Sequence, residues 1–336
     1  MAKSTTHISA SAHTLTMGLC ATLITVEDAT PKVLTVEGGL PFGTFDPEKD
    51  FTLHLGLHRW IHEQTGLMPN YVEQLYTFGN RFRDPGELAG GPRVISVGYL
   101  GLMPPTQPKT TDAHWQPIYD FLPWEDQRTE NKKLIEKYIV PALKLWANEA
   151  PTPKETNRRL QRLTLNWGHF ATGDSKTPFD NERVLERYQM LYEAGLVEEA
   201  HRDYKTLHGK TTNLPMSDRV GRLTDLQRIA KQTGTPMPLD HRRILASALQ
   251  RFRGKLKYRP LVFEILAPTF TLFELQKVVE ALSGTKLHKQ NFRRLVLNEG
   301  LVQETGKSDT SGRGRPAALY KFREEVLYER PAPGLS

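Results

Sequence analysis

The residues best placed to do chemistry lie in the stretch HRWIHEQTGL, residues 58–67. On a helix, positions 60, 63 and 64 are spaced i, i+3 and i+4 and therefore share one face. Three carboxylates at this spacing could together hold hard divalent cations, whose charge can assist hydrolysis. Only Glu63 is a carboxylate here, because Trp60 cannot ligate Mg²⁺ and Gln64 is a neutral, weaker ligand. We therefore expect no metal ligands, no catalytic residues and negligible hydrolase activity.

The side chains around this stretch are candidates for binding a small effector instead. Arg59 would contact a ligand phosphate or form an ordinary helical ion pair with Glu63, four residues on. Trp60 would stack on an adenine, fill the former metal site, or pack in the core. Besides Arg59, Trp60 and Glu63, the candidates in loops and strand ends are Phe45, Tyr76, Arg81 and Arg83.

A competing pattern overlaps the same stretch. His54, His58 and His62 recur every four residues, a spacing that can place two imidazoles on one zinc ion. They lie on a different flank from Trp60 and Gln64, and no nearby carboxylate or cysteine completes a ligand set. We expect a solvated histidine edge.

Strands and one helix must position these residues. Two apolar, β-branched runs, residues 14–26 and 32–36, flank the turn EDATP and predict a hairpin. Residues 51–64 predict a helix that is capped by Thr52 and stopped by Gly66. Residues 71–79 and 93–103 predict strands, joined by a turn-rich segment. A mixed α/β domain therefore occupies roughly the first hundred residues.

The middle of the chain predicts helices without a recognisable motif. After a linker-like break at 104–111, residues 125–150, 181–206 and 239–258 have helical patterns. Turn-rich segments interrupt the region at 209–218 and 232–240. Its role is open, with dimerisation and a lid as the two interpretations.

The C-terminal block carries the clearest pattern. Thr271 and Glu274 form a capping box ahead of an apolar helix that Gly284 ends. A second helix, HKQNFRRLVLNEG, places Phe292, Leu295 and Val296 on one face. Gln290 and Arg294 point nearly opposite to that face, flanked by Asn291 and Arg293, and side chains of these types read base edges in a major groove.

Two short predicted strands then flank a loop rich in glycine and arginine. Arg313 and Arg315 at such a tip suit a narrow minor groove or phosphates. Helix, turn, helix and basic hairpin together predict a winged helix-turn-helix that binds DNA. The alternative is a small protein-interaction domain with a basic surface, and the absence of an aromatic stacking platform argues against RNA.

The charge distribution supports this division. The 336-residue chain has a net charge of +7, but residues 241–323 carry 17 Lys and Arg against 6 Asp and Glu. That block is therefore +11 and the remainder −4, an asymmetry typical of a sensor joined to a polyanion binder. A solvated basic face is the alternative.

Cysteine content and hydropathy exclude several classes. Cys20 is the single cysteine, so an internal disulfide or a cysteine-based zinc cluster is excluded, and we expect it to pack in the core. The sequence shows neither an apolar signal core at its start nor a run long enough to span a bilayer. We expect a cytoplasmic protein with no membrane partner.

Several blocks closely resemble one family. DHRRILA (240–246), HKQNFRRLV (288–296) and GRGRPA (312–317), with the earlier run from LPFGTFDPEKD to RVISVGYLGL, resemble the Nudix-related transcriptional regulators of NAD metabolism. These are the NrtR/NadQ type, and the extended middle is more similar to the longer NadQ type. The last residues of the Nudix motif, Arg-Glu-apolar-x-Glu-Glu-x-Gly-apolar, align with 59–67, so two of three metal-ligand glutamates are missing.

The resemblance implies an α/β Nudix-like sensor domain with a helical extension and a C-terminal winged helix-turn-helix. The expected units are residues 1–120, 121–238, 239–258 as connecting helix, and 259–330. It implies a homodimer on a palindromic double-stranded operator of NAD synthesis or salvage genes. It assigns the recognition helix to Lys289, Gln290, Asn291, Arg293 and Arg294 and the wing to Arg313 and Arg315.

The leading hypothesis is therefore a repressor that requires no cofactor and responds to an adenine-nucleotide effector such as NAD, ADP-ribose or ATP. The first alternative is an active Nudix-type ADP-ribose pyrophosphatase fused to a DNA-binding module. The second is a non-specific nucleic-acid binder or interaction scaffold, which predicts similar affinity for any duplex.

Overall fold

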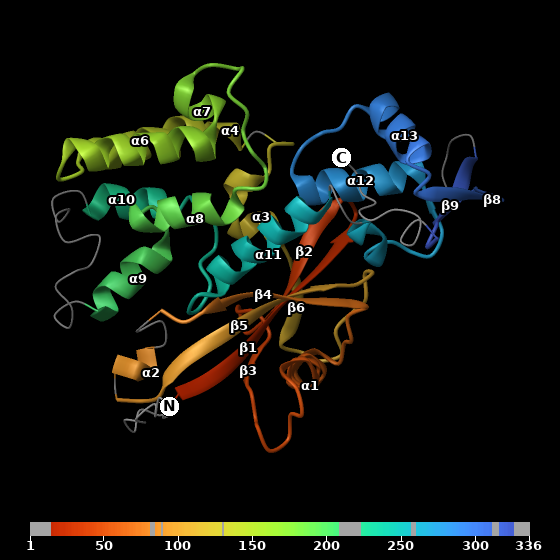
Figure 1. The fold of residues 1–336 in the computed structure, drawn as a ribbon, viewed down its shortest axis with the longest axis horizontal. Coiled ribbons are helices and arrows are strands. Elements are labelled where there is room, and N and C mark those ends of the chain that lie inside the picture. The colour runs from red at the N-terminus through yellow and green to blue at the C-terminus, as the bar shows by residue number, and fades with distance from the viewer. Residues whose placement is uncertain are drawn as a thin grey trace, which may run out of the picture.

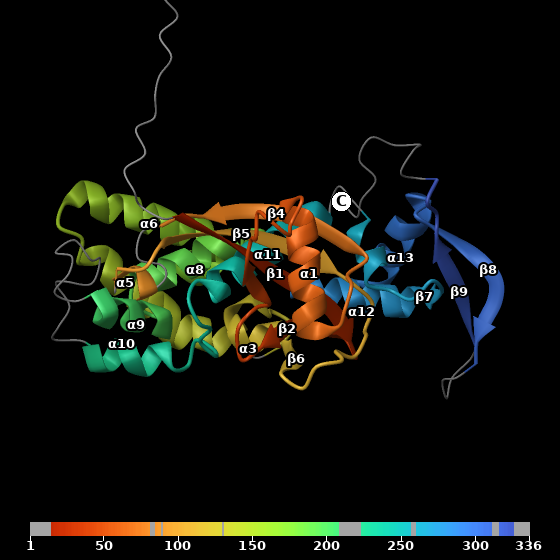
Figure 2. The ribbon, with the colours of Figure 1, turned by 90° about the horizontal axis from the view of Figure 1, so that it is seen from below.

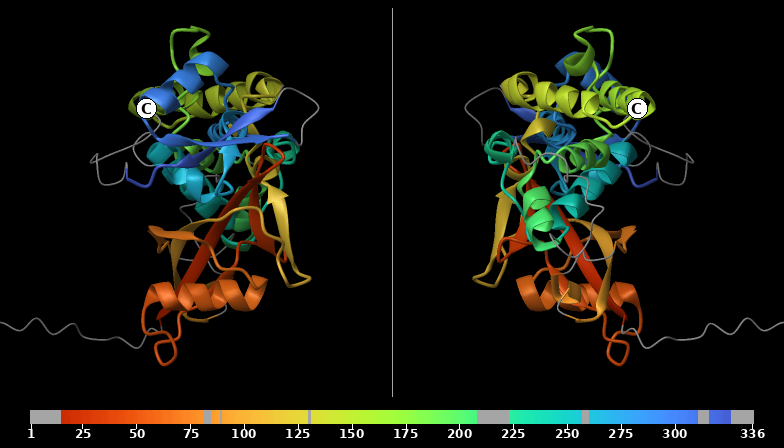
Figure 3. Two further views of the ribbon diagram at one scale, coloured as in Figure 1. Left: turned by 90° about the vertical axis from the view of Figure 1, so that its right-hand side faces the viewer. Right: turned by 90° about the vertical axis from the view of Figure 1, so that its left-hand side faces the viewer.

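The structure, a computed structural model, describes residues 15–80, 85–88, 90–129, 131–207, 223–256, 260–310 and 316–325. A mixed sheet lies between one helix on one face and a helical layer on the other (Figure 1). The winged helix packs at one end of this layer, as both side views show (Figures 2 and 3). No helix in the described ranges is both long and apolar enough to cross a membrane.

The N-terminal part of the described chain forms a six-stranded sheet in the order β4-β5-β1-β2-β6, with β3 paired to β1. Its strands are β1 (Leu15–Glu27), β2 (Thr30–Val36), β3 (Phe42–Thr44), β4 (Tyr71–Phe78), β5 (Arg93–Leu102) and β6 (Ala113–Pro117). β1 and β5 are parallel from Leu15↔Arg93 to Ile24↔Leu102, and the other pairs are antiparallel. The predicted hairpin and both predicted strands are confirmed, whereas β3 and β6 were not predicted.

The side chains of β1 alternate between the two faces of the sheet, which explains why each face is covered by its own apolar cluster. Leu19, Ala21 and Leu23 pack in the cluster beneath α1 (Leu53–Thr65), whereas Cys20 and Ile24 belong to the cluster on the opposite face. Successive strand side chains point to opposite faces, so a strand buried on both sides reads as a continuous apolar run. Cys20 is buried, as expected for a packing residue.

Helices fill the middle of the chain. After α2 (Pro85–Leu88) they are α3 (Ile118–Phe121), η1 (Pro123–Glu125), α4 (Lys132–Leu134), the π-helical η2 (Ile135–Ile139), α5 (Val140–Asn148), α6 (Pro153–Trp167), α7 (His169–Thr172), α8 (Val184–Glu193), α9 (Glu198–Leu207), α10 (Leu223–Ala230) and α11 (His241–Leu256). The single helix predicted for 181–206 is wrong, because Gly195 has φ +70° and separates α8 from α9. The helix predicted for 125–150 begins only at Lys132, after the 3-10 turn η1.

The C-terminal part contains η4 (Leu261–Glu264), β7 (Phe270–Thr271), α12 (Leu272–Ser283), α13 (Lys289–Asn298), β8 (Val302–Asp309) and β9 (Ala317–Phe322). Strands β7, β9 and β8 form a small antiparallel sheet. The predicted boundary between residues 258 and 259 lies outside the described residues, and the division into units stays a prediction.

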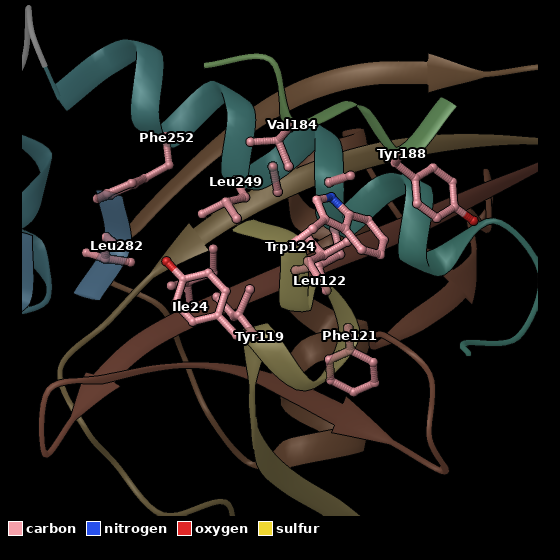
Figure 4. Packing of buried hydrophobic residues seen from close by; sticks show 14 of the residues in the cluster. Ile24, Tyr119, Phe121, Leu122, Trp124, Val184, Tyr188, Leu249, Phe252 and Leu282 are labelled. Atoms are coloured by element: carbon pink, nitrogen blue, oxygen red, sulfur yellow. The ribbon is translucent and has the colours of Figure 1, made fainter. Parts of the chain in front are cut away.

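One apolar cluster joins these parts. Ile24 of the sheet, Trp124 of η1, Val184 of α8, Leu249 of α11 and Leu282 of α12 lie together in it (Figure 4). All five have an exposed fraction of zero. The sheet, the helical middle and α12 therefore share one packed interior, and α12 also lies directly against β1 and β2.

Candidate functional site

Helix α1 forms where its capping residues predict it. The Thr52 hydroxyl accepts a hydrogen bond from the backbone N–H of Leu55, and Gly66 ends the helix in the left-handed conformation at φ 67°. Leu57 and Ile61 bury the inner face against the sheet. The outer face therefore presents positions 59, 60, 63 and 64 beside β3.

Trp60 and Gln64, which depart from the Nudix motif, bind α1 to β3 through hydrogen bonds. The Trp60 indole N–H donates to the carbonyl of Thr44 at 2.8 Å. Gln64 binds Phe42 twice: its side-chain oxygen accepts from the backbone N–H at 3.1 Å and its amide donates to the carbonyl at 2.8 Å. The Trp60 ring covers Gly43 so closely that a Cβ there would lie 2.0 Å from it. A carboxylate at 64 would lack the donor that this pairing uses.

The residues present do not fit the divalent metal that the Nudix motif implies. Glu63 is half exposed, and its carboxylate lies 3.4 Å from the Arg59 guanidinium. In the described ranges, no group of three or more His, Cys, Asp or Glu is arranged to hold a metal ion. Trp60 and Gln64 supply no anionic ligand.

Arg59 has a stronger partner than Glu63. Its Nε and Nη2 each donate to the Asp50 carboxylate at 2.8 Å, a two-pronged ion pair. Asp50 is 5% exposed and also accepts from the backbone N–H of Asp46. The Arg59 hydrogen bonds, opposed by burial, lower the pKa of Asp50. Arg59 therefore ties the loop before α1 to the helix, and sequence reasoning missed Asp50.

The histidine edge has one close pair. The Nε2 atoms of His54 and His58 lie 3.2 Å apart, and their ring centroids are separated by 4.4 Å. Burial and the neighbouring His54 lower the pKa of His58, which favours the neutral ring.

The remaining effector candidates do not lie together. Phe45 is half-buried against the cluster beneath α1. Tyr76 is on the opposite face of the sheet, where its exposed ring meets Phe78 edge-on at 5.3 Å. Arg81 and Arg83 lie outside the described residues. The candidates thus divide between the α1 face and a pocket beside α6, α8 and α11.

The predicted DNA-reading face is exposed on α13. The capping box of α12 is present, with Thr271 and Glu274 bonded reciprocally, and Gly284 ends that helix. Phe292 and Val296 bury one side of α13. The other side exposes Lys289, Gln290, Asn291 and Arg294, while Arg293 is half-buried. Strands β8 and β9 form the predicted wing, but Arg313 and Arg315 lie outside the described residues.

A buried ion cluster joins the helical middle to α12. The carboxylate of Glu125 in η1 receives hydrogen bonds from Arg187 of α8 and Arg253 of α11, the shortest of each being 2.6 Å. Arg253 also donates to the carbonyl of Leu282, and the hydroxyl of Tyr119 donates to the carbonyl of Ala281 at 2.6 Å. We call Tyr119, Glu125, Arg187 and Arg253 the junction cluster.

The junction cluster was not predicted from the sequence. Burial alone would raise the pKa of Glu125, but Arg187 and Arg253 lower it, so the ionised form is held in the interior. Each arginine also donates to backbone carbonyls, Arg187 to Asn166 and Arg253 to Asn181. The C-terminal end of α12 is thereby fixed to the helical layer.

The C-terminal domain matches a family of known proteins. Residues 262–322 match the family model described as the NrtR DNA-binding winged helix domain. The ADPR-responsive transcriptional repressor NtrR of Acinetobacter baylyi is 40% identical over 86 residues, which are 26% of this chain. The match spans about a third of that relative, 34% of its length.

Solved structures share the whole fold. NrtR of Shewanella oneidensis, crystallised with a 27mer DNA, superposes with a TM-score of 0.52 at 22% identity, covering 93% of this chain and 95% of that one. A MutT/nudix family protein from Enterococcus faecalis gives a TM-score of 0.50 at 14% identity, covering 94% and 88%. At these identities the likeness shows the fold alone.

Fold and site together define a class in which a Nudix-like α/β domain, carrying a helical extension, is joined to a winged helix domain. Within that class, residues 262–322 of this chain are similar to the NrtR DNA-binding winged helix domain, and the whole chain shares the fold of NrtR from Shewanella oneidensis.

Proposed function

We propose that the chain is a transcriptional repressor of NAD synthesis or salvage genes, controlled by an adenine nucleotide that its Nudix-like domain binds. The observation that carries the proposal is the exposed Lys289, Gln290, Asn291 and Arg294 on α13, inside a domain that matches the NrtR winged helix model. These side chains can make paired hydrogen bonds to guanine and adenine edges. The predicted wing residues Arg313 and Arg315 would add contacts to phosphates or the minor groove.

The effector is proposed from two lines of support. The Acinetobacter relative is named as ADPR-responsive, and the fold of this chain is Nudix-like. ADP-ribose is therefore the first effector to test, followed by NAD and ATP. Because Trp60 and Gln64 bind β3, we further propose that the chain holds its nucleotide without hydrolysing it and needs no cofactor.

We also propose that the protein binds a palindromic operator as a homodimer. A homodimer would place two α13 helices on successive major grooves of a palindromic site. Its place of action would be the cytoplasm, where that DNA lies. A mass of about twice 38.2 kDa in light scattering is expected.

Replacing Arg294 with Ala should test the DNA site. Selection from a random duplex library with the wild-type protein supplies the probe, and we expect an inverted repeat. Loss of one paired contact should weaken binding about 5- to 150-fold in a gel-shift titration. Arg158→Ala, at an exposed arginine of α6 with 63% side-chain exposure, is the matched control and should bind normally.

Two results would overturn the proposal. Selection that enriches no sequence would leave a non-specific binder, with equal affinity for any duplex. Equal binding by R294A and wild type would show that α13 does not read the operator.

A further inference from the structure

Two histidines on the first two turns of α1 face one another. His54 and His58 are four residues apart, so their side chains lie on the same face of the helix. Their Nε2 atoms are 3.2 Å apart, and their ring centroids are 4.4 Å apart at an interplanar angle of 50°. His58 and His62 have the same spacing, yet the close ring contact found in the described part of the chain is between His54 and His58. The fold therefore selects one of two possible pairs.

The distance between the two Nε2 atoms suits a shared metal ion. An imidazole nitrogen binds zinc at about 2.0–2.1 Å, so two such ligands at the tetrahedral angle lie about 3.3–3.4 Å apart. The observed separation of 3.2 Å agrees with this value to within about 0.2 Å, the tolerance expected of a metal site. A hydrogen bond between the two rings gives a similar distance, and titration with a metal distinguishes the two arrangements.

The pair is open to solvent and its chemistry narrows the class of ion. His54 is exposed and His58 is half-buried, so an ion can reach the two rings from outside. Neutral imidazole is a common ligand of Zn²⁺, Ni²⁺ and Cu²⁺, whereas Mg²⁺ prefers the oxygen atoms of carboxylates and water. Two imidazoles at this distance therefore favour a transition-metal ion over Mg²⁺.

We propose that His54 and His58 bind one divalent ion of the zinc class through their Nε2 atoms, with water completing the coordination. At about 100° per residue, Trp60 points about 120–160° away from the two histidines. The site is therefore separate from the positions 60, 63 and 64, where the Nudix motif would hold its metal. The inference does not depend on the proposed repressor function.

The bound ion joins the first and second turns of α1. The same end of the helix is held by the Thr52 cap and by the ion pair of Arg59 with Asp50, and the ion adds a third attachment. An ion that binds the folded helix more tightly than the unfolded chain stabilises the protein as its free concentration rises. The temperature of unfolding should therefore increase with added Zn²⁺ and return to its original value with a chelator.

Calorimetric titration of the metal-stripped, full-length protein with ZnCl₂ tests the site. We expect the wild type to bind Zn²⁺ saturably, and His54→Ala to weaken that binding by at least about 10-fold, since even the outer partners of metal ligands contribute 10–100-fold. His62→Ala, at an exposed histidine of the same helix outside the pair, is the matched control and should bind as the wild type does. MgCl₂ should not compete with Zn²⁺ for the pair.

Electron paramagnetic resonance of the protein with one equivalent of Cu²⁺, which binds such sites more tightly than Zn²⁺, gives a second measurement. The wild type should show coupling to two imidazole nitrogens, and H54A should show coupling to one at most. No saturable Zn²⁺ binding by the wild type, or equal affinity in wild type and H54A, would overturn the site and leave a hydrogen-bonded pair. Loss of binding in H62A with full binding in H54A would also overturn it, because the ion would then lie elsewhere on α1.

Discussion

Asp50 is a buried carboxylate that holds an exposed helix in place. It accepts two hydrogen bonds from Arg59 of α1 and one from the backbone N–H of Asp46 in the preceding loop. The Asp50 carboxylate therefore connects this loop to α1. An ion pair with paired hydrogen bonds is more specific in geometry than the Arg59–Glu63 contact at 3.4 Å. At this scale, Arg59 acts as a structural residue of α1.

Replacing Asp50 with Asn should reduce the free energy of unfolding at neutral pH and have a shrinking effect in acid. The Arg59 hydrogen bonds lower the pKa of Asp50 from its ordinary value of 3.8, against the effect of burial. A carboxylate whose pKa is lowered on folding stabilises the protein above its unfolded-state pKa. That stabilisation is lost as pH falls below 3.8 through the folded-state value.

Urea unfolding at a series of pH values from 7 down to 3 measures this. The difference between wild type and D50N should be largest at pH 7 and decrease towards pH 3. Glu48→Gln, at an exposed neighbouring carboxylate, should show no such trend. A difference that is constant across the series would contradict the assigned role.

Helix α1 and strand β3 behave as one element. Trp60 and Gln64 stand where the resemblance to the Nudix motif predicts two metal ligands, and each makes a hydrogen bond to the backbone of β3. These contacts give the helix a fixed position against the sheet.

Restoring both carboxylates, W60E with Q64E, should not restore hydrolysis. The change removes the indole packed on Gly43, its hydrogen bond to the Thr44 carbonyl and the amide donor to the Phe42 carbonyl, so we expect destabilisation of about 1–3 kcal/mol. AMP release from ADP-ribose with Mg²⁺, followed by chromatography, is the measurement. Robust turnover by the wild type would instead support an active pyrophosphatase. Turnover by the double variant alone would contradict the prediction, because it would show that the two carboxylates are all that the site lacks for hydrolysis.

Local signals explain which elements could be predicted. Helices α1 and α12 follow from the capping residue and the terminating glycine at their own ends, such as Thr52 and Gly66 of α1. Helix α13 has no side-chain cap and follows from its helical periodicity. Strand β3 has only three residues in a loop rich in Gly and Pro, and it forms because β1 and the side chains of α1 bind it. The helix α6 was missed, although Thr152 caps it in the same manner as Thr52 caps α1.

The candidate site was predictable only where its parts are close in sequence. The exposed face of α13 follows from helical periodicity alone. The partners of Glu125 lie 62 and 128 residues away, and the pocket at Tyr76 draws on α6, α8 and α11. Such contacts depend on how the helices pack, which periodicity does not specify.

At the scale of the whole molecule, the six-stranded sheet, the helical middle and the winged helix share one interior. The apolar cluster runs from the sheet through α8 and α11 to α12, and the junction cluster lies within it. A shift in the sheet, α8 or α11 therefore has a packed route to α12. We expect the winged helix to respond to strain in α8 or α11.

Tyr119→Phe should weaken this coupling while leaving both binding sites intact. It removes the hydroxyl that donates to Ala281 and accepts from Arg253, but retains the ring. The effector should then change operator affinity by a smaller factor, measured as gel-shift affinity with and without nucleotide. An unchanged factor would exclude the hydroxyl from the route.

Glu125→Gln, in the same junction cluster, should reduce the stability of the fold strongly. It leaves Arg187 and Arg253 buried without a counter-charge, so we expect a loss of about 3–5 kcal/mol in unfolding free energy. Thermal unfolding measures this loss. A variant as stable as the wild type would show that the two arginines do not depend on the carboxylate.

The closeness of Gly43 and Trp60 has an evolutionary consequence. Any side chain at 43 would begin 2.0 Å from the indole, so the glycine cannot be replaced while the tryptophan stays. Loss of Trp60 would in turn release position 43 from the requirement for glycine. The two positions are thus expected to change together along a lineage, with the tryptophan replaced first. Any change that introduces a side chain at position 43 must follow that order, and each intermediate must still fold.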